Sequence, residues 1–166
     1  MTDVRQVYVA IGSNCQREVM LSAAYQRLKN YFTVICLSPV YRSKAVGFIG
    51  DDFYNAVIRF STDNSLPKTN KILHQIERHL DPAAKTYKNK RCKIDLDLLL
   101  YGDMTVTTAQ YELPRADIIK YAFVLRPLAD IAPTRKHPQL AKTYEVLWKE
   151  LFSTDTTELN VVNFNW

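Results

Sequence analysis

"KRCKIDLDLLLYGD", which spans Lys90–Asp103, joins a basic run to an apolar segment that carries two aspartates. Successive side chains of a strand point to opposite faces, so Asp95 and Asp97 are expected to share one face with Leu99. The residues expected on the opposite, buried face are Ile94, Leu96, Leu98 and Leu100. The segment therefore predicts a half-buried strand over 94–102 that displays two carboxylates about 7 Å apart on its other face.

Two like charges this close are costly unless a cation lies between them. A divalent metal would serve, and Mg²⁺ is the natural one because it binds one or two carboxylates and completes its shell with water and phosphate oxygens. Ion pairs with the basic run, or plain solvent exposure, would serve as well. The basic run belongs to a loop expected over 83–93, whose cations are Lys85, Lys88, Lys90, Arg91 and Lys93.

Carboxylates for Mg²⁺ and cations for phosphate oxygens are the ingredients of phosphoryl transfer. The sequence has no G-x-x-x-x-G-K-[ST] loop, which excludes a P-loop enzyme. A solvated basic loop beside an exposed sheet face explains the same residues, so the pattern alone leaves both readings open.

Upstream of this strand, residue alternation and helical spacing predict further strands and helices. In chain order they are a strand at 5–12, a helix at 17–31, a strand at 33–43 bent or ended by Pro39, a strand at 53–61, and a helix from the Ser65 cap to Asp81-Pro82. The first helix is expected to bury Met20, Ala24, Leu28 and Tyr31. The resulting order, β-α-β-β-α-β, predicts an α+β, ferredoxin-like fold.

Beyond Gly102 the sequence predicts a C-terminal helical extension. A short strand is expected at 104–108, helical segments near 119–130 and 141–152, and a weakly patterned tail. Nothing in the composition marks a linker, so 1–166 is expected to form a single domain.

The net charge of the chain suits an anionic ligand. The formal net charge is +5, which fits a nucleotide or nucleic acid and fits an ordinary solvated surface equally well. Three cysteines without metal-site or redox spacing are expected to be reduced thiols. There is neither a signal-peptide pattern nor an apolar run of about 18 residues, so no membrane association and a cytoplasmic location are expected.

Seven stretches occur together in a family-specific order: "YVAIGSN", "SPVYRS", "DFYNAV", "QIE", "IDLDLLLYG", "ELPRAD" and "FVLRPLADIAP". Through these stretches and their order, the chain resembles the 6-hydroxymethyl-7,8-dihydropterin pyrophosphokinase family over roughly residues 5 to 133. The resemblance implies transfer of pyrophosphate from ATP to the hydroxymethyl group of a reduced pterin, a step of folate synthesis, with ATP and Mg²⁺ required.

The resemblance also implies site roles. Asp95 and Asp97 match the aspartates that hold two Mg²⁺ ions and, together with Arg91, the catalytic positions. The implied nucleotide-binding residues are Glu77, Lys85, Lys88, Lys93, Leu98 and Arg115. The implied pterin-binding residues are Ser43, Lys44, Val46, Phe53, Asn55 and Phe123. Without the family, the two phenylalanines read as core residues and Asn55 as a turn residue.

The chain departs from the family pattern around the nucleotide. A G-R-x-R-like element is replaced by Asp81–Ala84, the arginine before the aspartate pair is displaced by one residue to Arg91, and a common tryptophan is Asn89. Where the family has a His-Tyr pair, this chain has Arg115-Ala116. Where the family has an arginine, this chain has Tyr121. Arginine and lysine are not equivalent at a bidentate phosphate site, so these changes predict a divergent member.

Three hypotheses follow. The leading one is a Mg²⁺-dependent pyrophosphokinase that acts as a monomer. The alternative is a catalytically impaired homologue that binds a pterin or nucleotide as a regulatory or partner protein. An RNA-binding module is the third, and it is disfavoured because the aromatic RNP1-like pattern is missing.

Overall fold

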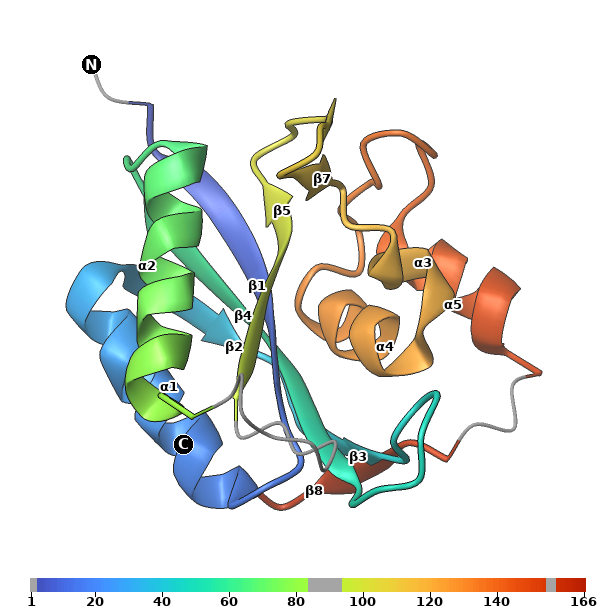
Figure 1. Ribbon diagram of the computed structural model, residues 1–166. Helices are drawn as coiled ribbons and strands as arrows, with labels where there is room; N and C mark the ends of the chain where they lie inside the picture. Colours follow the sequence, from blue (N-terminus) through green and yellow to red (C-terminus); the bar gives the residue numbers. More distant parts are fainter. Residues whose placement is uncertain (1–2, 84–93, 155–157) are drawn as a thin grey trace.

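The computed structural model describes residues 3–83, 94–154 and 158–166. It has a mixed α+β fold, as the sequence predicts, and helices cover both faces of one antiparallel sheet (Figure 1). The strands of this sheet are β1 (Arg5–Ser13), β2 (Thr33–Leu37), β3 (Val40–Ser43), β4 (Phe53–Thr62), β5 (Asp95–Tyr101) and β8 (Asn160–Val162). Strands β6 (Val106–Thr107) and β7 (Glu112–Leu113) pair separately.

The strand order is β5-β1-β4-β3-β8, and β2 also pairs with β4. Strand β1 lies between β4 and β5 and is antiparallel to both. The predicted second strand is divided at Ser38-Pro39 into β2 and β3, which pair with successive parts of β4. Proline cannot donate to a strand ladder, which explains the break.

Two layers of helix cover the sheet. The helices are α1 (Arg17–Tyr31), α2 (Leu66–Leu80), α3 (Asp117–Lys120), α4 (Ala122–Ile131) and α5 (Tyr144–Phe152). Figure 1 shows α1 and α2 on one side of the sheet and the other three on the opposite side. Each side has its own buried cluster, which includes Leu21, Leu28 and Leu73 on the first side and Leu125 and Leu128 on the second.

Helix α2 begins and ends where its sequence predicts. The Ser65 hydroxyl accepts a hydrogen bond from the Lys68 backbone N–H at 3.4 Å, and Pro67 occupies the first turn. Helix α1 differs in one respect, because Tyr31 is 52% exposed and Leu21 is buried instead. The core face of α1 is therefore rotated from the predicted one.

Strand β5 contains a bulge that corrects the predicted alternation. Leu98 pairs with Val9 and Leu100 pairs with Tyr8, so Leu99 is an extra residue in the ladder. Leu99 and Leu100 both join the cluster under α4. The prediction that Leu100 shares a face with Leu98 is therefore wrong. The two aspartates precede the bulge and keep their common face.

The C-terminal extension contains more than the predicted helices. The segment expected as one helix near 119–130 forms α3 and α4, and the last helix starts at Tyr144. The tail, expected to be weakly patterned, contributes β8, in which Val162 pairs with Val40 of β3. None of the described helices has both the length and the apolar character to cross a bilayer. Cys15 and Cys36 are free thiols.

Candidate active site

A cavity of about 320 Å³ opens on the sheet face that carries the two aspartates. It is bounded by β1, β4 and β5, by the segment after β3, and by the start of α3 and α4. The residues that line it are Ala10, Ile11, Gly12, Ser43, Lys44, Val46, Phe48, Phe53, Asn55, Ala56, Asp95, Asp97, Arg115, Asp117, Tyr121, Phe123 and Val124.

Small residues of β1 form the floor of the cavity. Gly12 pairs with Asp95 on one side and with Asn55 on the other, and Ala10 pairs with Asp97. Cross-strand partners share a face, so these positions place the acidic pair and Asn55 on either side of a shallow strip. A Cβ atom on Gly12 would lie 3.3 Å from Asn55 Oδ1, so glycine keeps this strip open.

One wall of the cavity combines a fixed amide with aromatic rings. Asn55 and Ser43 are both buried, and Asn55 Nδ2 donates to Ser43 Oγ at 2.8 Å. This hydrogen bond leaves Asn55 Oδ1 as an acceptor on the Gly12 side. Phe53 and Phe123 also line the cavity, and Phe123 is stacked on Tyr121 with ring centroids 5.1 Å apart.

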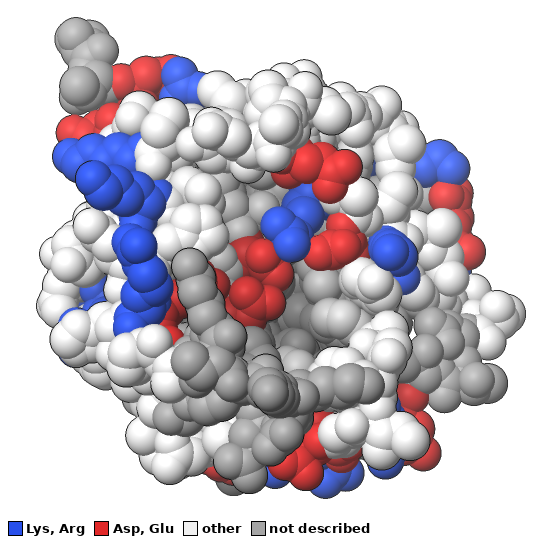
Figure 2. All heavy atoms as spheres, viewed as in Figure 1, with Lys and Arg blue, Asp and Glu red and all other residues white. Residues whose placement is uncertain are grey.

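The opposite wall is charged. Arg115 Nη2 lies 3.0 Å from Asp97 Oδ1, and Arg115 Nε donates to Asp117 Oδ2 at 2.8 Å. Asp97 and Asp117 are about 30% and 29% exposed, whereas Asp95 is more exposed. Figure 2 shows a basic patch between acidic patches near the middle of this face, beside a hollow.

The pKa values of the two aspartates are raised in this crowded acidic site. Loss of water and the charge of Asp95 raise the pKa of Asp97 from 3.8 to about 7, although Arg115 opposes the shift. Loss of water also raises the pKa of Asp95, and the charge of Glu77 adds to it. Perturbed pairs of this kind cluster at functional sites. The ionised pair therefore has a free-energy cost that a bound cation would relieve.

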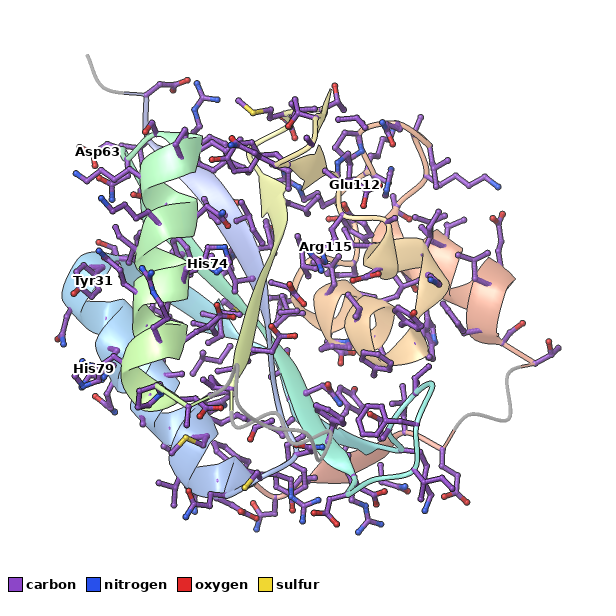
Figure 3. The ribbon with its side chains drawn as sticks, viewed as in Figure 1. Tyr31, Asp63, His74, His79, Glu112 and Arg115 are labelled. Atoms are coloured by element: carbon purple, nitrogen blue, oxygen red, sulfur yellow. The ribbon has the colours of Figure 1, made fainter. Side chains whose placement is uncertain are left out.

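Glu77 reaches this region from the other face of the sheet. Its Oε1 accepts a hydrogen bond from the Leu96 backbone N–H at 2.7 Å, and its Oε2 lies 2.9 Å from His74 Nδ1. Figure 3 shows His74 and Arg115 on either side of β5. Glu77 thus fixes the edge of β5 between the two aspartates rather than lining the cavity.

Leu98 does not line the cavity either. Its side chain is buried in the cluster under α1 and α2. Backbone groups of alternate residues in an antiparallel strand point the same way, so those of Leu98 point outward from β1, as the Leu96 N–H does. The backbone is therefore the part of Leu98 available to a ligand.

The donor set fits Mg²⁺ held jointly by protein and substrate. Asp95 and Asp97 supply hard oxygen ligands from one strand face, whereas the described residues contain no group of three or more His, Cys, Asp or Glu side chains that could hold a metal. Mg²⁺ uses few carboxylates and takes its remaining ligands from water and phosphate. The pair therefore suits a metal that arrives with a nucleotide.

The structure gathers most of the predicted site. The predicted residues that line the cavity are Ser43, Lys44, Val46, Phe53, Asn55, Asp95, Asp97, Arg115 and Phe123. Lys44 is mostly exposed and lies 3.8 Å from Asp52, and Val46 is 52% exposed, so both belong to the rim. The predicted residues Lys85, Lys88, Arg91 and Lys93 lie outside the described residues.

Some residues of the cavity were not predicted. Ala10 and Gly12 carry a sequence signal, since two small residues alternate with the large residues of β1 and mark an open face. Asp117 lies in the "ELPRAD" stretch next to Arg115. Phe48 carries no such signal, because it lies in an irregular segment.

Comparison with known proteins gives a consistent result. A model of the family described as 7,8-dihydro-6-hydroxymethylpterin-pyrophosphokinase matches residues 8–133. The 2-amino-4-hydroxy-6-hydroxymethyldihydropteridine pyrophosphokinase of Aquifex aeolicus is 30% identical over 138 residues, which cover 80% of this chain and 83% of that protein. The folic acid synthesis protein FOL1 of Dictyostelium discoideum is 32% identical over 136 residues, or 81% of this chain.

This chain spans a much smaller part of the longer relatives. The match covers 20% of the Dictyostelium protein and 19% of the related protein of Pneumocystis carinii. Among solved structures, the wild-type HPPK-DHPS of Plasmodium falciparum superposes with a TM-score of 0.74 at 13% identity, over 91% of this chain and 45% of that one. At this identity the superposition supports the fold alone.

Proposed function

Because the chain belongs to the 7,8-dihydro-6-hydroxymethylpterin-pyrophosphokinase family, we propose that it transfers pyrophosphate from ATP to the hydroxymethyl group of 6-hydroxymethyl-7,8-dihydropterin, a Mg²⁺-dependent step of folate synthesis. The non-catalytic alternative finds no support in the comparisons. The cytoplasmic location and the monomeric state stay predictions from the sequence.

The reaction exchanges one phosphorus–oxygen bond for another. The pterin hydroxymethyl oxygen attacks the β-phosphorus of ATP, the bond from that phosphorus to the oxygen shared with the α-phosphorus breaks, and AMP leaves. The hydroxyl proton passes to solvent. Positioning and charge stabilisation can carry such a step, so no dedicated general base is required.

The observation that supports this proposal most is the presence of two complementary walls in one cavity. Phe53 and Phe123 offer faces for a flat heterocycle, and Asn55 Oδ1 offers an acceptor for its N–H groups. Both walls bound the same cavity of about 320 Å³, with Asp95 and Asp97 on the charged wall. A ring held on the first wall therefore presents its substituent toward the second.

On the charged wall, Asp95 and Asp97 hold the metal, and Arg115 stabilises negative charge on the phosphates. Bound Mg²⁺ supplies neutralisation of the triphosphate and orients its oxygens. The backbone of Leu98 and the region around Glu77 contact the nucleotide. We also propose that the sheet and its first two helices are of the ferredoxin-like type, with the remaining helices and β8 as the extension.

The direct test measures AMP by chromatography after the protein is incubated with ATP, Mg²⁺ and 6-hydroxymethyl-7,8-dihydropterin. We expect AMP in equal amount to pyrophosphorylated pterin, and none when pterin or Mg²⁺ is omitted. Asp97→Ala should lose the Mg²⁺-dependent part of nucleotide binding in calorimetry while its circular dichroism is unchanged. If the wild-type protein releases no AMP above the pterin-free control, the proposed activity is wrong.

A further inference from the structure

Arg115 takes the position of a counter-ion in the acidic wall. Its Nη2 lies 3.0 Å from Asp97 Oδ1 and its Nε lies 2.8 Å from Asp117 Oδ2, so one guanidinium bridges two carboxylates. Arginine carries five N–H donors, and these two contacts leave others for a further partner. The bridge therefore holds Arg115 next to the ligand-binding face without using all its hydrogen-bonding capacity.

The backbone fixes where this side chain starts. The Arg115 backbone N–H donates to Leu99 O of β5 at 3.0 Å, just beyond the acidic pair. The side chain is 36% exposed, so solvent leaves it room to change rotamer. Asp117 lies two residues later, at the start of α3, so the contact through Nε can serve as a pivot for the rest of the guanidinium.

The contact with Asp97 conflicts with metal binding. A divalent ion on Asp95 and Asp97 places two positive charges within a few ångströms of the guanidinium, and like charges at such separations repel by about 1 kcal/mol or more even when hydrated. A triphosphate reverses the balance, because it brings several negative charges that attract the same guanidinium.

We propose that Arg115 is an exchangeable counter-ion: it neutralises Asp97 when the site is empty and transfers its Nη contact to a phosphate oxygen when metal and nucleotide bind, pivoting on Asp117. This inference deepens the proposed function and rests on it for the metal and the nucleotide. Its consequence is that Arg115 weakens binding of the free metal and strengthens binding of the metal–triphosphate complex, so that the two ligands enter together.

The test is to measure both affinities in Arg115→Met. Mn²⁺ serves as the metal probe at pH 8, read from the electron paramagnetic resonance signal of the free ion, and Mg²⁺ with a non-hydrolysable ATP analogue serves as the second ligand, read by calorimetry. We expect Mn²⁺ alone to bind about tenfold more tightly than to the wild-type protein, and the metal–nucleotide complex to bind at least about tenfold more weakly. Changes of opposite sign in these two affinities are what the exchange predicts.

Two variants separate this exchange from simpler effects. Arg5→Met makes the same change in net charge at a side chain of similar exposure that pairs with Asp3 outside the cavity, and it should alter neither affinity. Arg115→Lys keeps the charge but cannot bridge both carboxylates, so it should keep the wild-type Mn²⁺ affinity better than Arg115→Met does.

Mn²⁺ affinity that is unchanged or reduced in Arg115→Met would overturn the proposal, as would a failure of either protein to bind Mn²⁺ measurably. These outcomes are distinct from failure of the proposed function, which is read from AMP release by the wild-type protein.

Discussion

The acidic pair makes a quantitative prediction about stability. The ionised Asp97 side chain is destabilising in the ligand-free protein, because its pKa is raised from 3.8 to about 7 by loss of water and by Asp95. Asn has nearly the shape of a protonated aspartic acid and no charge. Asp97→Asn should therefore be more stable than the wild-type protein at pH 8, even though it should lose metal-dependent nucleotide binding.

The magnitude follows from proton linkage. The folded protein binds the proton of Asp97 more tightly than the unfolded chain does, so stability falls as pH rises from about 4 to 7. A pKa raised to about 7 corresponds to about 4 kcal/mol between the two protonation states. Asp97 is 30% exposed, and Asn also loses the charge-assisted contact with Arg115, so we expect a net gain of about 2 kcal/mol at pH 8.

The assay is urea unfolding in the presence of a chelator at pH 4.5, 6 and 8. The stability difference between variant and wild type should be largest at pH 8 and shrink toward zero at pH 4.5, because protonated Asp97 resembles Asn. Asp103→Asn is the matched control: that carboxylate pairs with Arg135 at 2.8 Å but is 90% exposed, so its effect should stay within about 0.5 kcal/mol. A destabilised Asp97→Asn at pH 8, or a difference independent of pH, would refute the reasoning.

Substitutions at three further positions test the cavity and the strand that carries its acidic pair. Gly12→Val should weaken pterin binding by at least about tenfold, measured by fluorescence titration, because even a Cβ would lie 3.3 Å from Asn55 Oδ1; unchanged affinity would place the pterin elsewhere. Tyr121→Leu should raise the KM for pterin about three- to tenfold with little change in kcat, whereas Tyr121→Phe should retain the stack on Phe123 and the wild-type KM; equal values for both variants would exclude stacking as the cause. Glu77→Ala should cost about 1 kcal/mol in urea unfolding, since it leaves the edge N–H of β5 to water, and Glu77→Gln should recover most of that loss if the hydrogen bond is responsible.

Local periodicity was sufficient for the elements that form the cavity. Alternation along β1, β4 and β5 placed Asp95 with Asp97, and Phe53 with Asn55, on common faces, and the cap at Ser65 placed the start of α2. The resemblance to a family then supplied a purpose for residues that a single sequence reads as core or turn. The departures it revealed included Arg115 and Tyr121, both of which line the cavity.

Other features had no local signal. The bulge at Leu99 reverses the alternation of β5 because β1 and β5 must both fill clusters on two sides of the sheet. Strand β8 forms because β3 offers an unpaired edge, which a weakly patterned tail can complete. The inward face of α1 also depends on its neighbours, since Leu21 is buried where Tyr31 was expected.

Within the regular stretches of strand that form the cavity, the sequence by itself determined which side chains share a face, because that depends only on the two-residue repeat of a strand. Only the tertiary structure decided which faces meet: that Gly12 lies between Asp95 and Asn55, that Ser43 holds the Asn55 amide, and that Arg115 reaches Asp97. These contacts depend on pairing between distant segments and on the loss of water where they pack, and neither quantity is encoded in the neighbours of a residue along the chain.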